Sequence, residues 1–438
     1  MRTLTVAVCG YGNRGSIYAT GESWFGSAMK VVAAADIRPE RLALAKERHH
    51  LPDDRLFASG EEMLQKPRMA DLMVISTQDQ QHCAHAIAAL EQGYHLLLEK
   101  PISTTLENCL AIAKKAKEVH RTVLVCHVLR YSPLYTKLRE MIREGKVGDV
   151  YAVDQIENVG YYHMAHSFVR GNWHSKEESA PMILAKSCHD LDILPWLVGK
   201  KVKRLSSFGH LSHFTSEHAP AGNAERCLDC AVRMNCPYDA VHLYYEGNPE
   251  FSIKTAHNTE WPVNVLCTDP TEEKVLDALR FGPYGQCAYR CHNDVVDHQT
   301  VNLECEDDVT ITFSMVAFTD RCTRTIQIMG TRGQINADMD NDYVTYRPFK
   351  GEPVQVPLDT AGIQGGSHGG SDYRMMEALL DHFAQYPEAN GFLDAGDVLV
   401  PEVDPPVCVI DDTLRSHIAC FAAEDSRLEH GKLMELNL

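Results

Sequence analysis

The feature of this chain that most constrains its fold is a glycine-rich turn directly after a short apolar run. Residues 4–8 predict a buried strand, and the turn that follows reads Gly10-Tyr11-Gly12-Asn13-Arg14-Gly15. Gly10 suits a tight turn, Gly12 lets a pyrophosphate approach the main chain, and Gly15 permits close packing of a helix on the strand. The N–H groups at the start of that helix bind phosphate charge. The pattern predicts a dinucleotide-binding strand, turn and helix.

The acidic residue expected after the second strand is also present. A second apolar run, residues 31–35, ends in Asp36. A carboxylate at this position accepts hydrogen bonds from both ribose hydroxyls of NAD and repels the 2′-phosphate of NADP. Arg38, two residues later, could pair with such a phosphate, so NADP is kept as the alternative. The two signals together favour NAD.

The order of apolar runs divides the chain into two parts. Up to residue 127, short apolar runs alternate with helical patterns, which predicts a doubly wound parallel sheet whose ligands lie at the carboxyl ends of the strands. Beyond about residue 150, strand-like runs follow one another, which predicts an α+β domain with a large open mixed or antiparallel sheet. Residues 206–300 interrupt that domain as a strand-poor, Cys-bearing insertion.

Bulk properties exclude several classes of function. The 438 residues carry 42 Lys and Arg against 60 Asp and Glu, a net charge of −18 at pH 7. Such a surface repels nucleic acid and anionic membranes, so neither is expected as a partner. We expect no transmembrane segment and no signal peptide. Most of the 15 cysteines stand singly in apolar runs. Scattered, reduced thiols of this kind favour the cytoplasm.

Two segments carry groups suited to hydride-transfer chemistry. Lys100 follows the predicted strand of residues 95–98 at its carboxyl end, where its ammonium group could stabilise a developing alkoxide. His189 is the natural proton acceptor, and Asp192, three residues later, shares its helix face and can fix its tautomer. Lys186 is a further catalytic candidate, able to contact the substrate. The bland alternatives are a surface lysine and a hydrogen-bonded core histidine.

One cysteine cluster differs from the scatter. Cys227, Cys230 and Cys236 have the spacing of a tetrahedral zinc site, and Cys287 is the best fourth ligand, with Cys291 as its alternative. We interpret such a site as structural, because an insertion with so little apolar periodicity is not expected to build a core of its own. Reduced buried thiols and an iron–sulfur cluster are the alternatives.

The chain resembles the glucose–fructose oxidoreductase/inositol dehydrogenase (Gfo/Idh/MocA) family over nearly its whole length. The segments that carry the resemblance, besides the glycine turn, are Ser76-Thr77-Gln78-Asp79 with His82, Glu99-Lys100-Pro101, His127 to Arg130-Tyr131, His189-Asp190-Leu191-Asp192 and Gly330-Thr331-Arg332-Gly333. The resemblance implies a Rossmann domain over residues 1–127 and a substrate and oligomerisation domain over residues 128–438. It also implies that Lys100 and His189 act together on a sugar-like hydroxyl beside the nicotinamide.

The resemblance further implies two sets of contacts. The cofactor set is Gly10, Tyr11, Gly12, Asn13, Arg14, Gly15, Asp36, Arg38, Ser76, Thr77, Gln78, Asp79, His82, Glu99, Lys100 and His127. Segments 166–173 and 293–298 are typical of a longer, carbohydrate-processing subgroup. The substrate candidates are Arg130, Arg170, Trp173, Asp294, His298, His368 and Asp372.

One departure from the family keeps more than one function open. Many of its dehydrogenases carry an aspartate one turn before the histidine, whereas this chain has Ala185. The leading hypothesis is an NAD-dependent oxidoreductase acting on a ring hydroxyl of a sugar, sugar derivative or polyol, as a homodimer or homotetramer. The alternatives are an NAD-dependent glycosidase or lyase that oxidises, eliminates and re-reduces, and a non-catalytic NAD-binding regulator.

Overall fold

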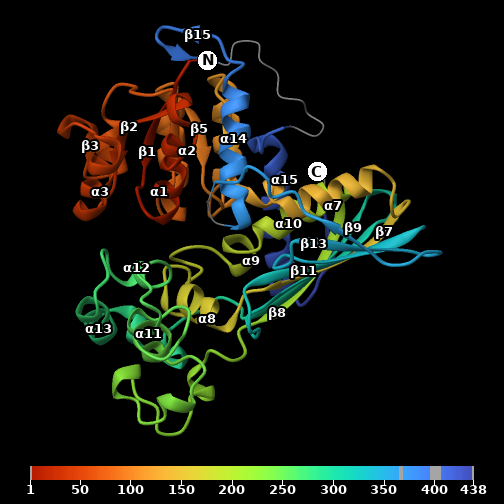
Figure 1. Cartoon of the computed structure of the whole chain (residues 1–438). Coiled ribbons are helices and arrows are strands. Elements are labelled where there is room, and N and C mark those ends of the chain that lie inside the picture. The colour runs from red at the N-terminus through yellow and green to blue at the C-terminus, as the bar shows by residue number, and fades with distance from the viewer. Residues whose placement is uncertain (1, 365–367, 395–405, 437–438) are drawn as a thin grey trace.

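A computed structural model describes residues 2–364, 368–394 and 406–436 of the chain (Figure 1). Its first sheet has six strands in the order β3-β2-β1-β4-β5-β6, and all neighbouring pairs are parallel. The strands are β1 Leu4–Cys9, β2 Met29–Ala35, β3 Leu56–Phe57, β4 Leu72–Ile75, β5 His95–Leu98 and β6 Val123–Val125. This order is that of a doubly wound dinucleotide-binding sheet, whose ligand site lies where β1 and β4 diverge.

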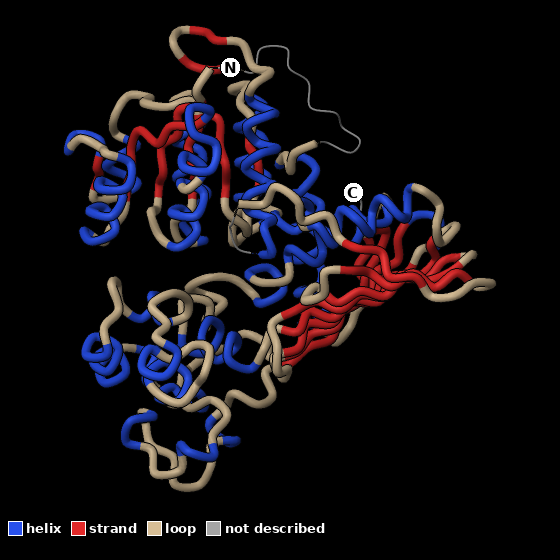
Figure 2. The backbone as a smooth tube through the Cα atoms, in the orientation of Figure 1, coloured by secondary structure: helices blue, strands red, loops and turns tan. Residues whose placement is uncertain are grey.

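Helices cover both faces of this sheet (Figure 2). Those that follow its strands are α1 Asn13–Ala19, α2 Gly21–Phe25, α3 Pro39–His49, α4 Gly60–Leu64, α5 His82–Glu91 and α6 Leu106–Glu118. The strands are apolar on both sides because each side faces a helix layer: Val6 and Val8 join one core, and Ala7 and Cys9 join the other. The predicted parallel sheet is confirmed.

The last part of the chain returns to this first domain. Helix α14, Ser371–Phe383, buries Met376 and Phe383 in the same core as Val6. Val409 makes an antiparallel bridge to Leu124 of β6. Helix α15, Ile410–Leu428, then packs between α6 and the second sheet. The two domains therefore share helices from the part of the chain, residues 128–438, that the family resemblance assigns to the second domain.

The second sheet has nine strands in the order β14-β13-β12-β11-β7-β10-β9-β8-β17. They are β7 Val150–Asn158, β8 Val202–His210, β9 His298–Cys305, β10 Thr310–Val316, β11 Thr323–Gly330, β12 Gly333–Asp338, β13 Tyr343–Pro348, β14 Val354–Pro357 and β17 Met434–Glu435. Only β7 and β10 pair in parallel, so the predicted mixed sheet is confirmed. Helices α7 Pro133–Arg143 and α10 Cys188–Val198 lie with α15 on one face (Figure 1).

The insertion is shorter than expected and has a core. Strand β8 extends to His210 and β9 begins at His298, so the insertion spans 211–297. It contains α11 Ile253–Ala256, α12 Val263–Leu266 and α13 Glu272–Phe281. Val241, Tyr244 and Leu279 are buried together in a cluster of their own. The expectation that this segment has no core was wrong, because side chains distant in sequence supply one.

All fifteen cysteines are free thiols. Within the described ranges, no helix has both the length and the apolar composition needed to cross a bilayer.

Burial of His95 makes stability depend on pH. Its Nδ1 accepts from Thr122 N–H at 3.1 Å and its Nε2 lies 3.3 Å from Leu393 O, so the ring is neutral. Burial, then the charges of Arg121 and Arg68, lowers the pKa of His95 from 6.5 to about 3. Below pH 6.5 the unfolded chain binds a proton that the folded chain does not, so the free energy of unfolding decreases as the pH is lowered.

The free energy of unfolding of the wild type decreases between pH 7 and pH 5, and we expect this decrease to be about 2 kcal/mol smaller in His95→Gln. Urea unfolding at both pH values measures this, with the exposed His218→Gln as control. An identical pH dependence in His95→Gln and the wild type would contradict the assignment of His95 as a neutral buried ring.

Candidate active site

The glycine turn has the geometry that its spacing predicts. Gly10 has φ +92°, and the N–H groups of Gly10 and Tyr11 donate to Ala35 O at 2.9 and 3.1 Å. A Cβ on Gly15 would lie 2.0 Å from Gly10 O, so α1 packs directly on the turn. A Cβ on Gly12 would meet no atom within 4 Å. The space beside Gly12 therefore fits an approaching phosphate group.

Two side chains of this turn face the protein interior. Tyr11 is buried, and its hydroxyl lies 2.7 Å from His49 Nε2, so only its main chain faces the crevice edge. Asn13 is exposed at the start of α1. Arg14 donates from Nε to Glu99 at 2.8 Å and pairs with Asp372 at 2.5 Å. Arg14 and Asp372 thus join α1 to α14.

The adenosine end of the crevice lies at the end of β2. Asp36 is half-buried, and its Oδ1 accepts from Arg38 N–H at 2.9 Å. The Arg38 side chain is exposed. Thr268 of the insertion donates to Glu40 of α3 at 3.2 Å. The insertion therefore reaches the dinucleotide-binding domain at this end.

The loop after β4 adds a second set of predicted cofactor residues. Ser76 donates from Oγ to Gly10 O at 2.7 Å, and Thr77 Oγ1 lies 3.1 Å from His85 Nδ1. The buried His82 ring lies 2.8 Å from Pro101 O and 3.2 Å from Thr77 O. Gln78 is exposed at the head of the next turn. These bonds hold the loops after β1, β4 and β5 together.

Lys100 is positioned from both of its ends. Glu99, which is 6% exposed, accepts from the Lys100 N–H at 2.9 Å, and the Lys100–Pro101 peptide bond is cis. The Lys100 Nζ donates to Ala185 O at 2.9 Å, in helix α9 Met182–Ala185 of the second domain. The partner of the lysine is thus the main-chain carbonyl of Ala185, whose side chain carries no acid.

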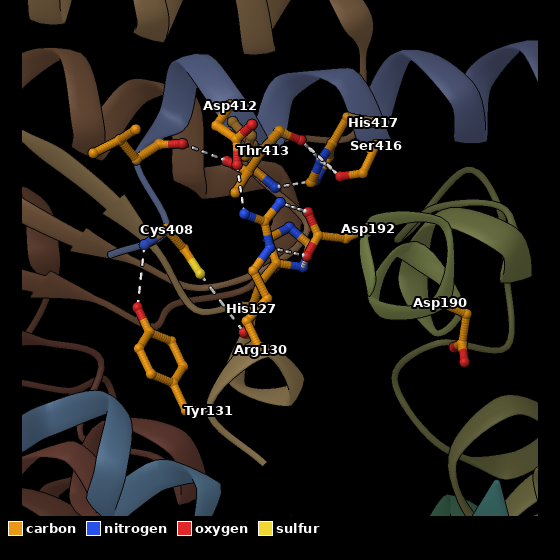
Figure 3. A network of polar contacts seen from close by, with 12 residues as sticks. His127, Arg130, Tyr131, Asp190, Asp192, Cys408, Asp412, Thr413, Ser416 and His417 are labelled. Carbon is orange, nitrogen blue, oxygen red and sulfur yellow. Dashed lines mark hydrogen bonds and ion pairs between the residues drawn. The ribbon is translucent and has the colours of Figure 1, made fainter. Parts of the chain in front are cut away.

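His189 lies beside a buried group of histidines. Its ring centroid is 5.7 Å from that of His127, which in turn is 5.7 Å from that of His417 (Figure 3 shows His127 and His417). Burial, then the charges of Arg130 and Lys100, lowers the pKa of His127 to about 3. His127 is therefore neutral, and its Nδ1 lies 3.7 Å from Asp192 Oδ2.

Asp192 and Asp190 join α10 to two different parts of the structure. Asp192 accepts two hydrogen bonds from Arg130, at 2.6 and 2.7 Å, and Arg130 also pairs with Asp412. Asp190 points away from this network (Figure 3). It accepts two hydrogen bonds from Arg324 of β11, at 2.7 and 2.9 Å. His189 shares the N-terminal end of α10 with the carboxylates of these two bidentate ion pairs, which fix the position of that end.

Lys186 faces the sheet. Its Nζ lies 3.3 Å from Glu157 Oε1 of β7. Burial by itself lowers the pKa of Lys186, but the Glu157 carboxylate outweighs burial and holds the pKa above its usual value. Lys186 is therefore held in its charged form beside the sheet, where it is a cation and a poor proton acceptor.

The predicted substrate residues are dispersed. Arg130 is buried in its ion pairs, and Asp372 is buried against Arg14. Arg170 donates to Gln286 O and Tyr238 O, at 2.8 and 2.6 Å. Each of these three groups therefore has protein partners.

The remaining substrate candidates lie nearer the surface. Trp173 donates to Asp79 at 3.1 Å, and Asp294 accepts from Lys176 N–H at 2.7 Å. His298 is the first residue of β9, and its Nδ1 lies 2.8 Å from Asp297 Oδ1. The side chain of His368 lies outside the described residues. As substrate contacts, all of these residues stay predictions.

The zinc prediction is not supported. Cys227, Cys230, Cys236 and Cys287 line one pocket of about 20 Å³. Within the described residues, however, no group of three or more His, Cys, Asp or Glu side chains is arranged to hold a metal. Cys291 donates instead to Cys287 O at 3.1 Å. The premise behind the zinc prediction, that the insertion builds no core of its own, does not hold, because Val241, Tyr244 and Leu279 are buried together there.

Sequence patterns missed the contacts between the domains. Ala185 acts through a carbonyl group, which every residue has, so its identity gives no signal. His417 lies 315 residues after its partner, the Ile102 N–H, which it accepts at 2.9 Å. Asp79 Oδ2 accepts from Trp173 and Ser179, and its predicted contact with the cofactor stays a prediction.

Substitutions of Gly12 and Gly15 test the phosphate site and the packing of the turn separately. We expect Gly12→Ala to keep wild-type stability and to weaken NADH binding at least tenfold, since its methyl group enters the space for phosphate. Gly15→Ala should lose about 2 kcal/mol or more of stability, because its Cβ overlaps Gly10 O. Urea unfolding and NADH fluorescence titration measure both. Wild-type NADH affinity in a folded Gly12→Ala protein would contradict the phosphate site.

Comparison with known proteins agrees with this geometry. Residues 4–127 match the model of the oxidoreductase family's NAD-binding Rossmann fold, and residues 139–397 match that of its C-terminal alpha/beta domain. The Bacillus subtilis protein YteT, named as an oxidoreductase, is 23% identical over 81% of this chain and 83% of its own length. Inositol 2-dehydrogenase 1 of Saccharopolyspora erythraea is 27% identical over 47% of this chain and 57% of its own.

A solved structure has the same fold throughout. The inositol dehydrogenase homologue of Azotobacter vinelandii, solved with NAD+, superposes with a TM-score of 0.68 at 14% identity over 99% of this chain and 98% of its own. The chain belongs to the Gfo/Idh/MocA oxidoreductase family, with an NAD-binding Rossmann domain and the C-terminal alpha/beta domain of that family.

Proposed function

We propose that this protein oxidises a ring hydroxyl of a sugar, sugar derivative or polyol with NAD. The observation that carries the proposal is that Lys100 and His189 both lie near His127, where the strand ends of the first domain contact α9 and α10 of the second. An ammonium group and an imidazole at the carboxyl edge of a dinucleotide-binding sheet are what alcohol oxidation requires.

Lys100 is suited to stabilise charge on a substrate oxygen. An ammonium group has three N–H donors, and the bond to Ala185 O uses one of them. The remaining donors can bind the hydroxyl and the alkoxide that forms as its proton leaves. The Glu99 carboxylate, fixed by Arg14, holds the Lys100 main chain in place during this change.

His189 is suited to take the hydroxyl proton. The ion pairs of Asp190 and Asp192 hold its turn of α10, so the imidazole needs little reorganisation to act as the base. Bound NAD supplies the acceptor for the hydride. Lys186 and Glu157 add a fixed pair of charges at the sheet side of the site.

Three finer features belong to the proposal. Asp36 supports NAD over NADP, because a carboxylate at the end of β2 repels a 2′-phosphate. The inositol dehydrogenase relatives support a cyclic polyol or sugar as the substrate class. The exposed Ile156 and Phe208 support a homodimer or homotetramer formed through the large sheet.

A second candidate keeps the cofactor but changes the net reaction. In it, NAD oxidises the ring transiently, the adjacent C–H becomes acidic, a substituent is eliminated, and the hydride returns to the product. The bond from Lys100 to Ala185 O favours it, since this chain lacks the acidic side chain that many dehydrogenases of the family have at that position.

The two candidates differ in stoichiometry. Net oxidation forms one NADH per product molecule, whereas elimination with re-reduction releases the substituent without accumulating NADH. Incubation with free sugars, polyols and aryl glycosides distinguishes the two candidates, if the absorbance of NADH and that of the released aryl substituent are both followed.

We expect Lys100→Met to lower the rate of hydride transfer at least a hundredfold, because the alkoxide loses its cation. NADH affinity should change less than threefold. Single-turnover NADH absorbance and fluorescence titration measure the two quantities, and the surface variant Lys114→Met is the control. A hydride-transfer rate equal to that of the wild type would remove Lys100 from the mechanism.

A further inference from the structure

A segment of the second domain crosses to the dinucleotide-binding domain and is bonded to it along its length. We call residues 173–185 the strap. It begins after the π-helical turn Met164–Arg170 and ends with helix α9, just before His189. Side chains and carbonyl groups of the strap bind Asp79, Gln80 and Lys100 of the first domain.

Asp79 makes the central fastening. It is 7% exposed, and its Oδ2 accepts from Trp173 Nε1 at 3.1 Å and from Ser179 Oγ at 3.0 Å. The neighbouring Gln80 donates to Glu177 O. A buried carboxylate that accepts from two donors across a domain boundary loses both hydrogen bonds if the domains separate, which costs free energy. The contact therefore favours the domain arrangement seen in this structure.

The second fastening lies at the other end of the strap, where Lys100 Nζ donates to Ala185 O at 2.9 Å. The strap is also anchored to its own domain, because Lys176 N–H donates to Asp294 Oδ1 at 2.7 Å. It therefore joins the two domains, and it can move with the second domain alone only when the bonds at Asp79 and Lys100 break.

The two fastenings bracket one region of the crevice. Asp79 lies in the loop after β4, and Lys100 lies two residues after the end of the neighbouring strand β5. In a doubly wound sheet, these strand ends face the nicotinamide half of a dinucleotide. The strap thus spans the part of the crevice where the reacting ring is expected.

We propose that the strap is a clasp over the nicotinamide end of the NAD site, and that Asp79 is the positioning residue that keeps it closed. This inference rests on the proposed function. In the closed state the strap presents Ala185 O to Lys100 and sets α9 against His189. Entry and release of the dinucleotide require the bonds at Asp79 to break, so these bonds set the rate of cofactor exchange.

Three variants weaken the clasp by different amounts. Trp173→Phe keeps an aromatic ring but loses the indole N–H, Ser179→Ala loses only the hydroxyl, and Asp79→Asn loses the charge of the acceptor. Asp239→Asn is the matched control, since Asp239 is a buried carboxylate that binds Arg233 and Val241 N–H inside the insertion. Urea unfolding of each variant reports any general loss of stability.

The rate of NADH release is the decisive measurement. Stopped-flow fluorescence of bound NADH, displaced by excess NAD+, should show release at least fivefold faster in each single clasp variant. The Trp173→Phe/Ser179→Ala double variant should release NADH at least tenfold faster, and the control should match the wild type. Release rates within twofold of wild type in all clasp variants would overturn the inference.

Proteolysis gives a readout that needs neither cofactor nor turnover. Glu177 and Glu178 are exposed on the strap, so a glutamate-specific protease should cut there faster in Asp79→Asn than in the Asp239→Asn control. Equal cutting of the two variants would count against the clasp. Wild-type protein that does not bind NADH would instead overturn the proposed function, so the two failures are distinguishable.

Discussion

The structure depends on one buried ion-pair group, formed by Arg14 with Glu99 and Asp372. Arg14 comes from α1, Glu99 from the end of β5, and Asp372 from α14, so three segments far apart in sequence meet at one guanidinium. Glu99 also accepts from Lys100 N–H, which couples the glycine turn to the position of the lysine. Removing one partner of such a group leaves a buried charge unpaired, which is strongly destabilising.

The histidine-rich interior beyond Lys100 is kept neutral by burial. His127 and His417 both have pKa values lowered to about 3, with burial as the largest cause. The neighbouring charges are instead concentrated in bidentate pairs, Arg130 with Asp192 and Arg324 with Asp190. His189 is therefore surrounded by neutral histidines and by charges that are fixed in ion pairs. Such surroundings suit a proton acceptor that must work beside a cation.

Much of the fold could be predicted because local patterns dictate it. The strand of residues 95–98 was predicted with the bounds that the structure shows, and the glycine turn has the predicted geometry. Strand β8 was missed because it borders an irregular insertion, and the core of that insertion was missed because Val241 and Leu279 are too far apart to give a period. The cysteine spacing suggested a metal site that the described residues do not form.

The sequence by itself determined the dinucleotide-binding turn, the acid after β2, and the presence of a lysine and a histidine suited to alcohol oxidation. These depend on residue type at short spacing, where backbone geometry leaves few alternatives. Only the tertiary structure decided that Asp79 binds Trp173 and Ser179, that Asp372 binds Arg14, and that the Ala185 carbonyl holds Lys100. Such contacts join residues 85 to 358 positions apart, and no local pattern encodes which groups will meet once the two domains pack.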